Sequence, residues 1–149
     1  MKIALLGSGN VATHLGKALK LNGHEIIQVW SKTLTHALEL GEILDSKYTD
    51  NLTDLTPDAE LYIISVSDDA IKEVASRIAL SNKIIVHTSG TTEIDIPGIS
   101  GVFYPIQTFS KQKNVDFSKI PIAIEGRNSE ITEVLYTQRP YQTGVRCFC

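Results

Sequence analysis

The stretch MKIALLGSGNVATHLGKAL, residues 1–19, decides the fold of this chain. The four apolar residues at 3–6 predict a buried strand, and they run directly into Gly7-Ser8-Gly9 with no polar spacer. Apolar side chains then recur at helical spacing: Val11, Leu15, Ala18 and Leu19. A strand, a glycine-rich turn and a helix therefore follow one another within the first 19 residues.

The same alternation continues along the rest of the chain. The patterns predict further strands at 25–30, 61–66, 83–87, 101–104 and 121–125, helices at 34–44 and 71–78, and a last helix beginning at 128–129. The helix over 34–44 is expected to be interrupted near Gly41, and the polar run 46–60 to hold a short edge strand and a loop. Strands that alternate with helices favour right-handed crossovers. We therefore predict an α/β fold, a doubly wound and mainly parallel Rossmann sheet in a single domain.

The glycine turn has the spacing of a dinucleotide-binding loop. Residues 7–12 fit the pattern G-x-G-x-x-G/A, directly after a strand and at the start of a helix. Gly7 permits the tight turn, Gly9 lets a pyrophosphate approach the backbone, and the small Ala12 lets the helix pack closely on the strand. The first amides of the helix would then face the phosphates. The alternative is a tight strand-to-helix turn that binds no ligand.

The end of the second strand favours one dinucleotide over the other. Sites that prefer NAD usually carry an acidic residue there, and residues 29–33 have none. The hydroxyl of Ser31 and the ammonium group of Lys32 suit a 2′-phosphate instead, so we expect NADP (as NADPH) and regard NAD as the lesser alternative. Lys32 could also be an ordinary solvated lysine in a turn.

Polar residues also follow the strands predicted at 61–66 and 83–87. Ser67 stands where the strand order should reverse, and it either touches the cofactor or caps the next helix. His87 and Ser89 are the candidate catalytic residues, because they should face the open nicotinamide end and a histidine can exchange a proton. His87 could equally be a strand-end histidine satisfied by a neighbour. The other histidines are expected on helix or turn surfaces and lack metal-ligand spacing, so no metal site is expected: His14, His24 and His36.

Several of these stretches together resemble a known family. IALLGSGNVATHLGKAL, WSKT, LYIISVSDDAI, IIVHTSGT and GVFYPIQTFS resemble Rossmann-like NADP oxidoreductases that carry a C-terminal domain of unknown function and are related to pyrroline-5-carboxylate reductase and the F420-dependent NADP reductases. The resemblance covers residues 1 to about 128 and implies a set of cofactor contacts. By this resemblance, the pyrophosphate would be held by Gly7, Ser8, Gly9, Asn10 and Val11. The adenosine phosphate would meet Ser31 and Lys32, the cofactor would be lined by Val66 and Ser67, and the nicotinamide pocket would be bordered by Thr88, Ser89 and Pro105.

The resemblance also implies a departure at the C-terminal end. We expect residues 1–128 to form the NAD(P)-binding Rossmann domain, and 129–149 a truncated or aberrant helix and tail in which Pro140 and Gly144 break the helical pattern. Family members continue into a helical domain that closes the substrate cleft and usually forms a homodimer. The expectation is therefore a truncated or frame-shifted product that lacks the substrate domain. Cys147 and Cys149 are expected to belong to a frayed tail rather than to a metal or dithiol site.

Composition excludes some functions and leaves others open. A net charge of −3 over 149 residues gives no electrostatic reason to bind nucleic acid or anionic membrane. No apolar run approaches the ~20 residues that span a bilayer, and a body without cysteine favours the cytoplasm. We expect an NADP-dependent oxidoreductase that transfers hydride to or from a small, unidentified substrate. The alternatives are a non-catalytic NAD(P) sensor or regulatory module, and a nucleotide-using Rossmann protein such as a methyltransferase, which the absence of an acid after the second strand disfavours.

Overall fold

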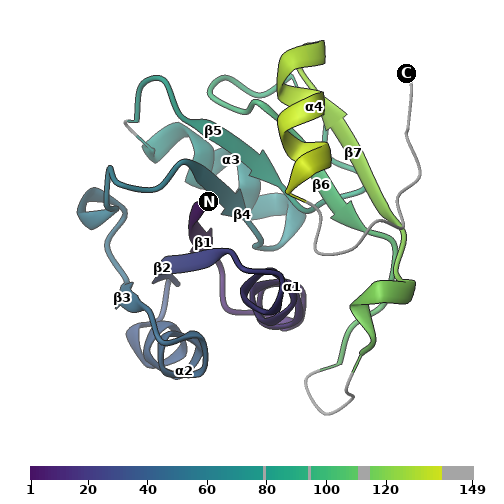
Figure 1. Cartoon of the computed structure of the whole chain (residues 1–149). Coiled ribbons are helices and arrows are strands. Elements are labelled where there is room, and N and C mark those ends of the chain that lie inside the picture. The colour runs from purple at the N-terminus through teal and green to yellow at the C-terminus, as the bar shows by residue number, and fades with distance from the viewer. Residues whose placement is uncertain (79, 94, 111–114, 139–149) are drawn as a thin grey trace.

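The computed structural model describes residues 1–78, 80–93, 95–110 and 115–138, which form one α/β domain (Figure 1). The strands are β1 (Lys2–Leu6), β2 (Glu25–Trp30), β3 (Lys47–Thr49), β4 (Leu61–Ile64), β5 (Ile84–His87), β6 (Gly101–Pro105) and β7 (Ile122–Gly126). The helices are α1 (Asn10–Leu21), α2 (Leu34–Leu44), α3 (Asp68–Arg77) and α4 (Ser129–Thr137), with 3₁₀ turns at Leu52–Asp54 and Phe117–Lys119. The strand and helix alternation predicted from the sequence is confirmed.

All strands join one seven-stranded sheet in the order β3-β2-β1-β4-β5-β6-β7. Neighbouring strands from β3 to β6 are parallel, and β7 alone pairs antiparallel with β6. The order reverses at β1, which pairs with β2 on one side and with β4 on the other. This is the doubly wound, mainly parallel Rossmann arrangement, and the crevice beside such a reversal is where these sheets bind ligands.

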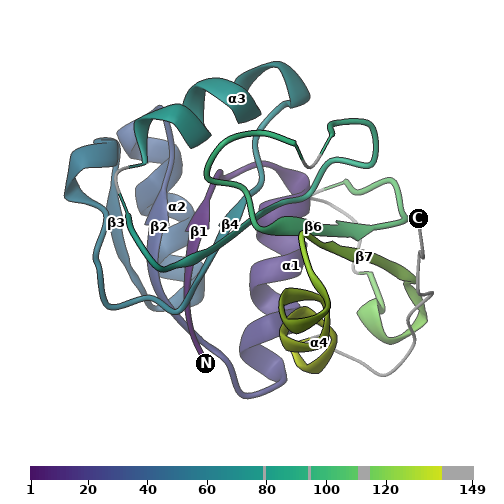
Figure 2. The same cartoon turned by 90° about the horizontal axis from the view of Figure 1, so that it is seen from above.

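Helices cover both faces of the sheet, as Figures 1 and 2 show. Along β1, Ile3 and Leu5 join the core cluster that also contains buried residues of α1, α2 and α4, while Ala4 and Leu6 join the cluster that contains α3. Successive side chains of a strand point to opposite faces, so a strand covered on both sides reads as a continuous apolar run. The run at residues 3–6 therefore marks a central strand.

Two local expectations are corrected. The helix α2 is not interrupted near Gly41 but runs through it from Leu34 to Leu44. A Cβ at position 41 would lie 3.1 Å from the Cβ of Tyr48, so the glycine allows β3 to pack closely on the helix. Ser67 occupies the N-cap position of α3, yet its side chain makes no capping hydrogen bond.

The last described helix packs on the same sheet. Asn128 precedes α4, and its side chain accepts a hydrogen bond from the backbone N–H of Ile131 at 2.9 Å. Leu135 is fully buried in the core cluster of α1 and α2. Residues 129–138 are thus built into the domain, and the tail expected at 139–149, with its proline, glycine and two cysteines, lies outside the described residues.

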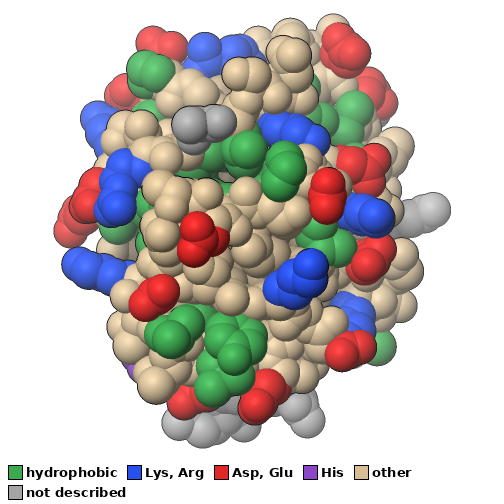
Figure 3. Space-filling view, turned by 90° about the vertical axis from the view of Figure 1, so that its left-hand side faces the viewer, with side chains coloured by type: hydrophobic (Ala, Val, Ile, Leu, Met, Phe, Trp, Pro, Cys, Tyr) green, Lys and Arg blue, Asp and Glu red, His purple; other side chains and the backbone are tan. Residues whose placement is uncertain are grey.

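None of the described helices combines the length and the apolar character that a bilayer crossing requires. On the face shown in Figure 3, acidic and basic side chains are interspersed rather than gathered by sign. Mixed charge of this kind keeps the local electrostatic field of that face small.

Candidate functional site

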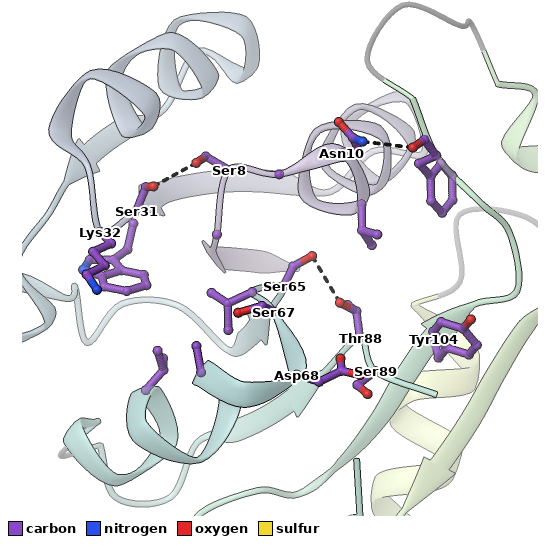
Figure 4. A pocket seen from close by; sticks show the side chains of 18 of the residues that line it. Ser8, Asn10, Ser31, Lys32, Ser65, Ser67, Asp68, Thr88, Ser89 and Tyr104 are labelled. Atoms are coloured by element: carbon purple, nitrogen blue, oxygen red, sulfur yellow. Dashed lines mark hydrogen bonds between the residues drawn. The ribbon is translucent and has the colours of Figure 1, made fainter. Parts of the chain in front are cut away.

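A cavity of about 750 Å³ opens beyond the carboxyl ends of β1, β2, β4, β5 and β6 (Figure 4). It lies at the reversal of strand order between β1 and β4. Residues that follow these strands supply most of its wall: Gly7, Ser8, Gly9, Asn10, Val11, Ser31, Lys32, Ser65, Val66, Ser67, Thr88, Ser89 and Gly90. With two exceptions, His87 and Pro105, every site residue named from the sequence lines this one cavity.

The two glycines of the loop differ in what surrounds them. Gly7 has a φ of +132° and donates its N–H to the carbonyl oxygen of Trp30 at 2.7 Å. A Cβ there would overlap the carbonyl group of Ser65, because the ends of β1 and β4 meet at this point. A Cβ at Gly9 would instead meet no atom within 4 Å. Gly7 is therefore required by the protein itself, whereas Gly9 borders open space.

That open space has the character of an anion site. Gly9 is the N-cap of α1, and no side chain caps this end of the helix. Its first turn carries no acidic residue. The N–H groups at the start of a helix have no intrahelical acceptor, and the helix dipole makes that end positive. The cradle left open at Gly9 thus fits a phosphate group, as the sequence predicts for the pyrophosphate.

The residues at the end of β2 form one side of the cavity. Ser31 is buried, and its Oγ lies 2.8 Å from the Oγ of Ser8, so the second strand is tied to the glycine loop (Figure 4). Lys32 is exposed and lines the cavity. Asp50 follows β3 and also lines it, which brings a carboxylate that the sequence after the second strand did not reveal. The cavity therefore holds charges of both signs.

Helix α3 contributes a further wall that sequence reasoning missed. The residues on this wall share one helical face: Ala70, Glu73, Val74 and Arg77. Arg77 and Glu73 form an ion pair with 3.6 Å between Nη1 and Oε1. The spacing of these residues at three and four positions was a usable signal, because such positions lie on the same side of a helix.

The loop after β5 is held by hydroxyl groups. The Oγ1 of Thr88 donates to the Oγ of Ser65 at 3.1 Å. The Oγ of Ser89 accepts the backbone N–H groups of Thr91 at 3.2 Å and Thr92 at 3.0 Å. The Oγ1 of Thr91 in turn donates to the Oδ2 of Asp68, the first residue of α3, at 2.7 Å. These bonds fix the loop against α3 at the edge of the cavity.

His87 does not face the cavity, so that expectation is wrong. Its side chain is fully buried at the end of β5 and is not part of the cavity wall. The Nδ1 atom accepts the backbone N–H of Ser89 at 3.2 Å. Burial lowers the pKa of the imidazole below 6.5, although nearby groups oppose this shift. The ring is therefore a buried neutral acceptor that holds the loop of Thr88 and Ser89.

The far wall is formed by Tyr104 and by residues 107–109 rather than by Pro105. Pro105 is buried in β6 and does not line the cavity, because its neighbour Tyr104 points that way (Figure 4). A Cβ at Gly90 would lie 2.6 Å from the ring of Tyr104, so the loop after β5 closely approaches β6. Residues 106–110 have no regular secondary structure, and no periodic pattern marks them in the sequence.

His14 corrects another expectation, because it is buried rather than on the surface of α1. Its ring stacks on Phe109 with centroids 5.3 Å apart, and its Nε2 lies 2.9 Å from the carbonyl oxygen of Ser110. One turn earlier, the Nδ2 of Asn10 donates to the carbonyl oxygen of Phe109 at 2.9 Å. The start of α1 is thus joined to the far wall of the cavity. Within the described part of the chain, no group of three or more His, Cys, Asp or Glu side chains is placed to hold a metal ion.

The domain is similar to several solved structures. The structure of the "putative NADP oxidoreductase BF3122" from Bacteroides fragilis is 37% identical, superposes with a TM-score of 0.90, and matches 98% of this chain over 60% of its own length. A pyrroline-5-carboxylate reductase from Streptococcus pyogenes is 18% identical with a TM-score of 0.73, covering 100% of this chain and 58% of that one. An imine reductase from Myxococcus stipitatus, solved with NADP+, is 15% identical with a TM-score of 0.74, covering 99% and 55%. The last two likenesses show the fold alone.

The fold and the cavity at its reversal point define a dinucleotide-binding domain of the NADP oxidoreductase type. Residues 2–90 match the family described as NADP oxidoreductase, coenzyme F420-dependent, and the chain belongs to this family. It spans about 60% of the length of the Bacteroides fragilis protein. No curated protein matches it.

Proposed function

We propose that the chain binds NADP(H) in this cavity, as the cofactor-binding part of an oxidoreductase that transfers hydride to or from a small substrate. The observation that carries the proposal is the open cradle at Gly9, which faces the uncapped start of α1. Because a Cβ at Gly9 would meet no atom within 4 Å, a phosphate group could approach the backbone there. Bound NADPH would supply the hydride, and the protein would bind, orient and shield it.

The wall residues would divide the cofactor between them. The backbone of residues 7–11 would hold the pyrophosphate, while Ser31 and Lys32 would meet the adenosine phosphate at the end of β2. Val66 and Ser67, which also line the cavity, would contact the cofactor. Since the adenosine half extends toward β2, the nicotinamide half extends toward Thr88, Ser89 and the far wall. In this arrangement Tyr104 takes the place that the sequence assigned to Pro105.

NADPH rather than NADH would be the preferred cofactor, because Lys32 offers a positive charge where an NAD site usually has an acid. Replacing Lys32 with alanine should weaken NADPH binding by about tenfold, from the loss of roughly 1–2 kcal/mol, and leave NADH binding almost unchanged. Lys17→Ala is a matched control, because Lys17 is exposed on α1 and does not line the cavity. Titration of both cofactors at fixed salt measures this. Equal affinities for both cofactors in the unsubstituted chain would contradict the preference.

The second candidate is an NAD(P) sensor without catalytic activity. It is favoured by the burial of His87 and by the hydroxyl groups of Thr88 and Ser89, which already bond within the protein. NADPH oxidation against small imines, ketones and 2-oxo acids distinguishes the two functions. Turnover supports the oxidoreductase, whereas tight binding without turnover by both this chain and a longer form supports the sensor. We further propose a cytoplasmic protein that binds neither nucleic acid nor membrane, with homodimer formation belonging to a longer form.

A further inference from the structure

The start of α1 contacts the cavity in two ways at once. Its backbone borders the open cradle at Gly9, and its side chains reach the far wall. Asn10 and His14 are four residues apart, so they project from the same side of the helix toward one segment. Their partners are the consecutive carbonyl groups of Phe109 and Ser110, nearly 100 residues further along the chain.

The chemistry of these two contacts fixes the direction of both hydrogen bonds. A carbonyl oxygen only accepts, so the Nε2 of His14 must carry the proton that it shares with Ser110. Asn10 donates through its amide nitrogen, as Figure 4 shows. Aromatic stacking adds to these hydrogen bonds. The ring of Phe109 stacks on His14, with centroids 5.3 Å apart, and on Phe117, with centroids 5.6 Å apart.

We propose that Asn10 and His14 are positioning residues, which hold residues 107–109 as the wall of the nicotinamide end of the cavity. The proposal rests on the proposed function, since it assumes that NADP(H) lies in the cavity with its adenosine end at Lys32. Gln107, Thr108 and Phe109 line the cavity, and the segment has no secondary structure of its own to keep it in place. Its position therefore depends on the contacts that anchor it, and α1 supplies two of the hydrogen bonds and one of the stacking contacts.

This anchor links phosphate binding to the nicotinamide wall. The first turn of α1 is the element that a bound pyrophosphate would order, and the same turn carries Asn10. Ordering one end of the helix thus favours the correct position of a wall that lies across the cavity. A ligand that occupies only the adenosine end should gain little from this contact, whereas the full dinucleotide should gain more.

Two substitutions at position 14 separate the hydrogen bond from the stacking. His14→Phe keeps an aromatic ring against Phe109 and removes the donor to Ser110. His14→Gln removes the ring and can place an amide nitrogen where Nε2 was, so it should restore the hydrogen bond. Asn10→Ala removes the other donor. Lys17→Ala, on the exposed side of the same helix, is the control.

The test compares two probes by calorimetry, NADPH and 2′,5′-ADP. The second probe carries the adenosine with its 2′- and 5′-phosphates and lacks the nicotinamide half. His14→Phe and Asn10→Ala should each weaken NADPH binding about three- to tenfold, while the affinity for 2′,5′-ADP changes less than about twofold. His14→Gln should recover at least part of the loss. Without ligand, hydrogen exchange of the backbone at 107–110 should be faster in His14→Phe and Asn10→Ala than in the unsubstituted chain.

The outcomes distinguish this inference from the function on which it rests. If the unsubstituted chain binds both probes and the folded variants weaken both equally, or neither, the positioning role is wrong and the proposed function stands. Unchanged hydrogen exchange at 107–110 would also overturn it. If the unsubstituted chain binds neither probe, the proposed function fails and this inference fails with it.

Discussion

Substitutions at the two glycines of the phosphate loop should separate folding from binding. At Gly9 an added side chain enters open space, because a Cβ there meets no atom within 4 Å and the backbone is extended, with φ −74°. Gly9→Val should therefore change the free energy of unfolding by less than about 0.5 kcal/mol. Its methyl groups, however, occupy the place of the phosphate oxygens. The loss of two charge-assisted hydrogen bonds corresponds to about 3–6 kcal/mol, so NADPH affinity should fall at least a hundredfold.

At Gly7 the expected result is the reverse. Its φ of +132° is strained for any other residue, and an added Cβ overlaps the carbonyl group of Ser65. Strain and displacement of the β4 end together should destabilise Gly7→Ala by about 3 kcal/mol or more, which lowers Tm by about 6–12 °C in a domain of this size. Gly23 provides the control, because it also has a positive φ, of +83°, but has space around its Cβ. Gly23→Ala should lower the free energy of unfolding by only about 1–2 kcal/mol.

Thermal unfolding and NADPH titration of the three variants test this reasoning. The phosphate-loop assignment would be refuted by a folded Gly9→Val protein that binds NADPH as tightly as the unsubstituted chain. The packing argument would be refuted if Gly7→Ala were no less stable than Gly23→Ala.

Two further predictions concern buried polar side chains. Gln28 is buried in β2, donates to the carbonyl oxygen of Asp54 at 2.9 Å and accepts the N–H of Thr56 at 2.8 Å. Gln28→Leu should therefore lower the free energy of unfolding, measured by chemical denaturation, by about 2 kcal/mol. A decrease under about 0.5 kcal/mol would contradict this. Because burial lowers the pKa of His87 below 6.5, the unfolded chain binds the proton more readily, and stability should fall as pH decreases below about 6.5. His87→Asn, which keeps an acceptor for Ser89, should flatten this dependence, leaving the part due to His24, whose pKa is also lowered. If the free energy of unfolding of His87→Asn changed between pH 7 and pH 5 as steeply as that of the unsubstituted chain, the result would argue against a buried neutral ring at His87.

Sequence patterns predicted the part of the site whose residues lie close together along the chain. The apolar run at 3–6, the glycine loop and α1 lie within 21 residues, and each has a pattern with a direct physical cause. Lys32 could be placed at the cavity because it follows the second strand, whose carboxyl end lies at the same edge of a parallel sheet as that of the first strand. Thr88 and Ser89, which the family resemblance assigned to the nicotinamide pocket, line the cavity, and their contact with a nicotinamide stays a prediction.

The rest depends on packing between distant segments, which no local pattern reports. His14 has the sequence environment of a surface residue, yet it is buried, with its ring stacked on Phe109 and its Nε2 against the carbonyl oxygen of Ser110. His87 and Pro105 stand at strand ends, but the direction of a side chain there depends on the register and twist of the strand. Asp50 lines the cavity directly after β3, and the sequence predicted a short edge strand within the polar run 46–60 without fixing which residues follow it.

The central place of β1 also has a consequence for synthesis. This strand is made before β4, with which it pairs, and Ile3 lies opposite Leu61. Its apolar residues must therefore wait for about 58 further residues, which at a translation rate of 5–20 residues per second is about 3–12 s. During that interval one edge of the strand has no partner, and such an edge can pair with another chain. A chaperone or the ribosome surface that covers this edge of β1 would therefore lower the risk of such pairing while the chain is being made.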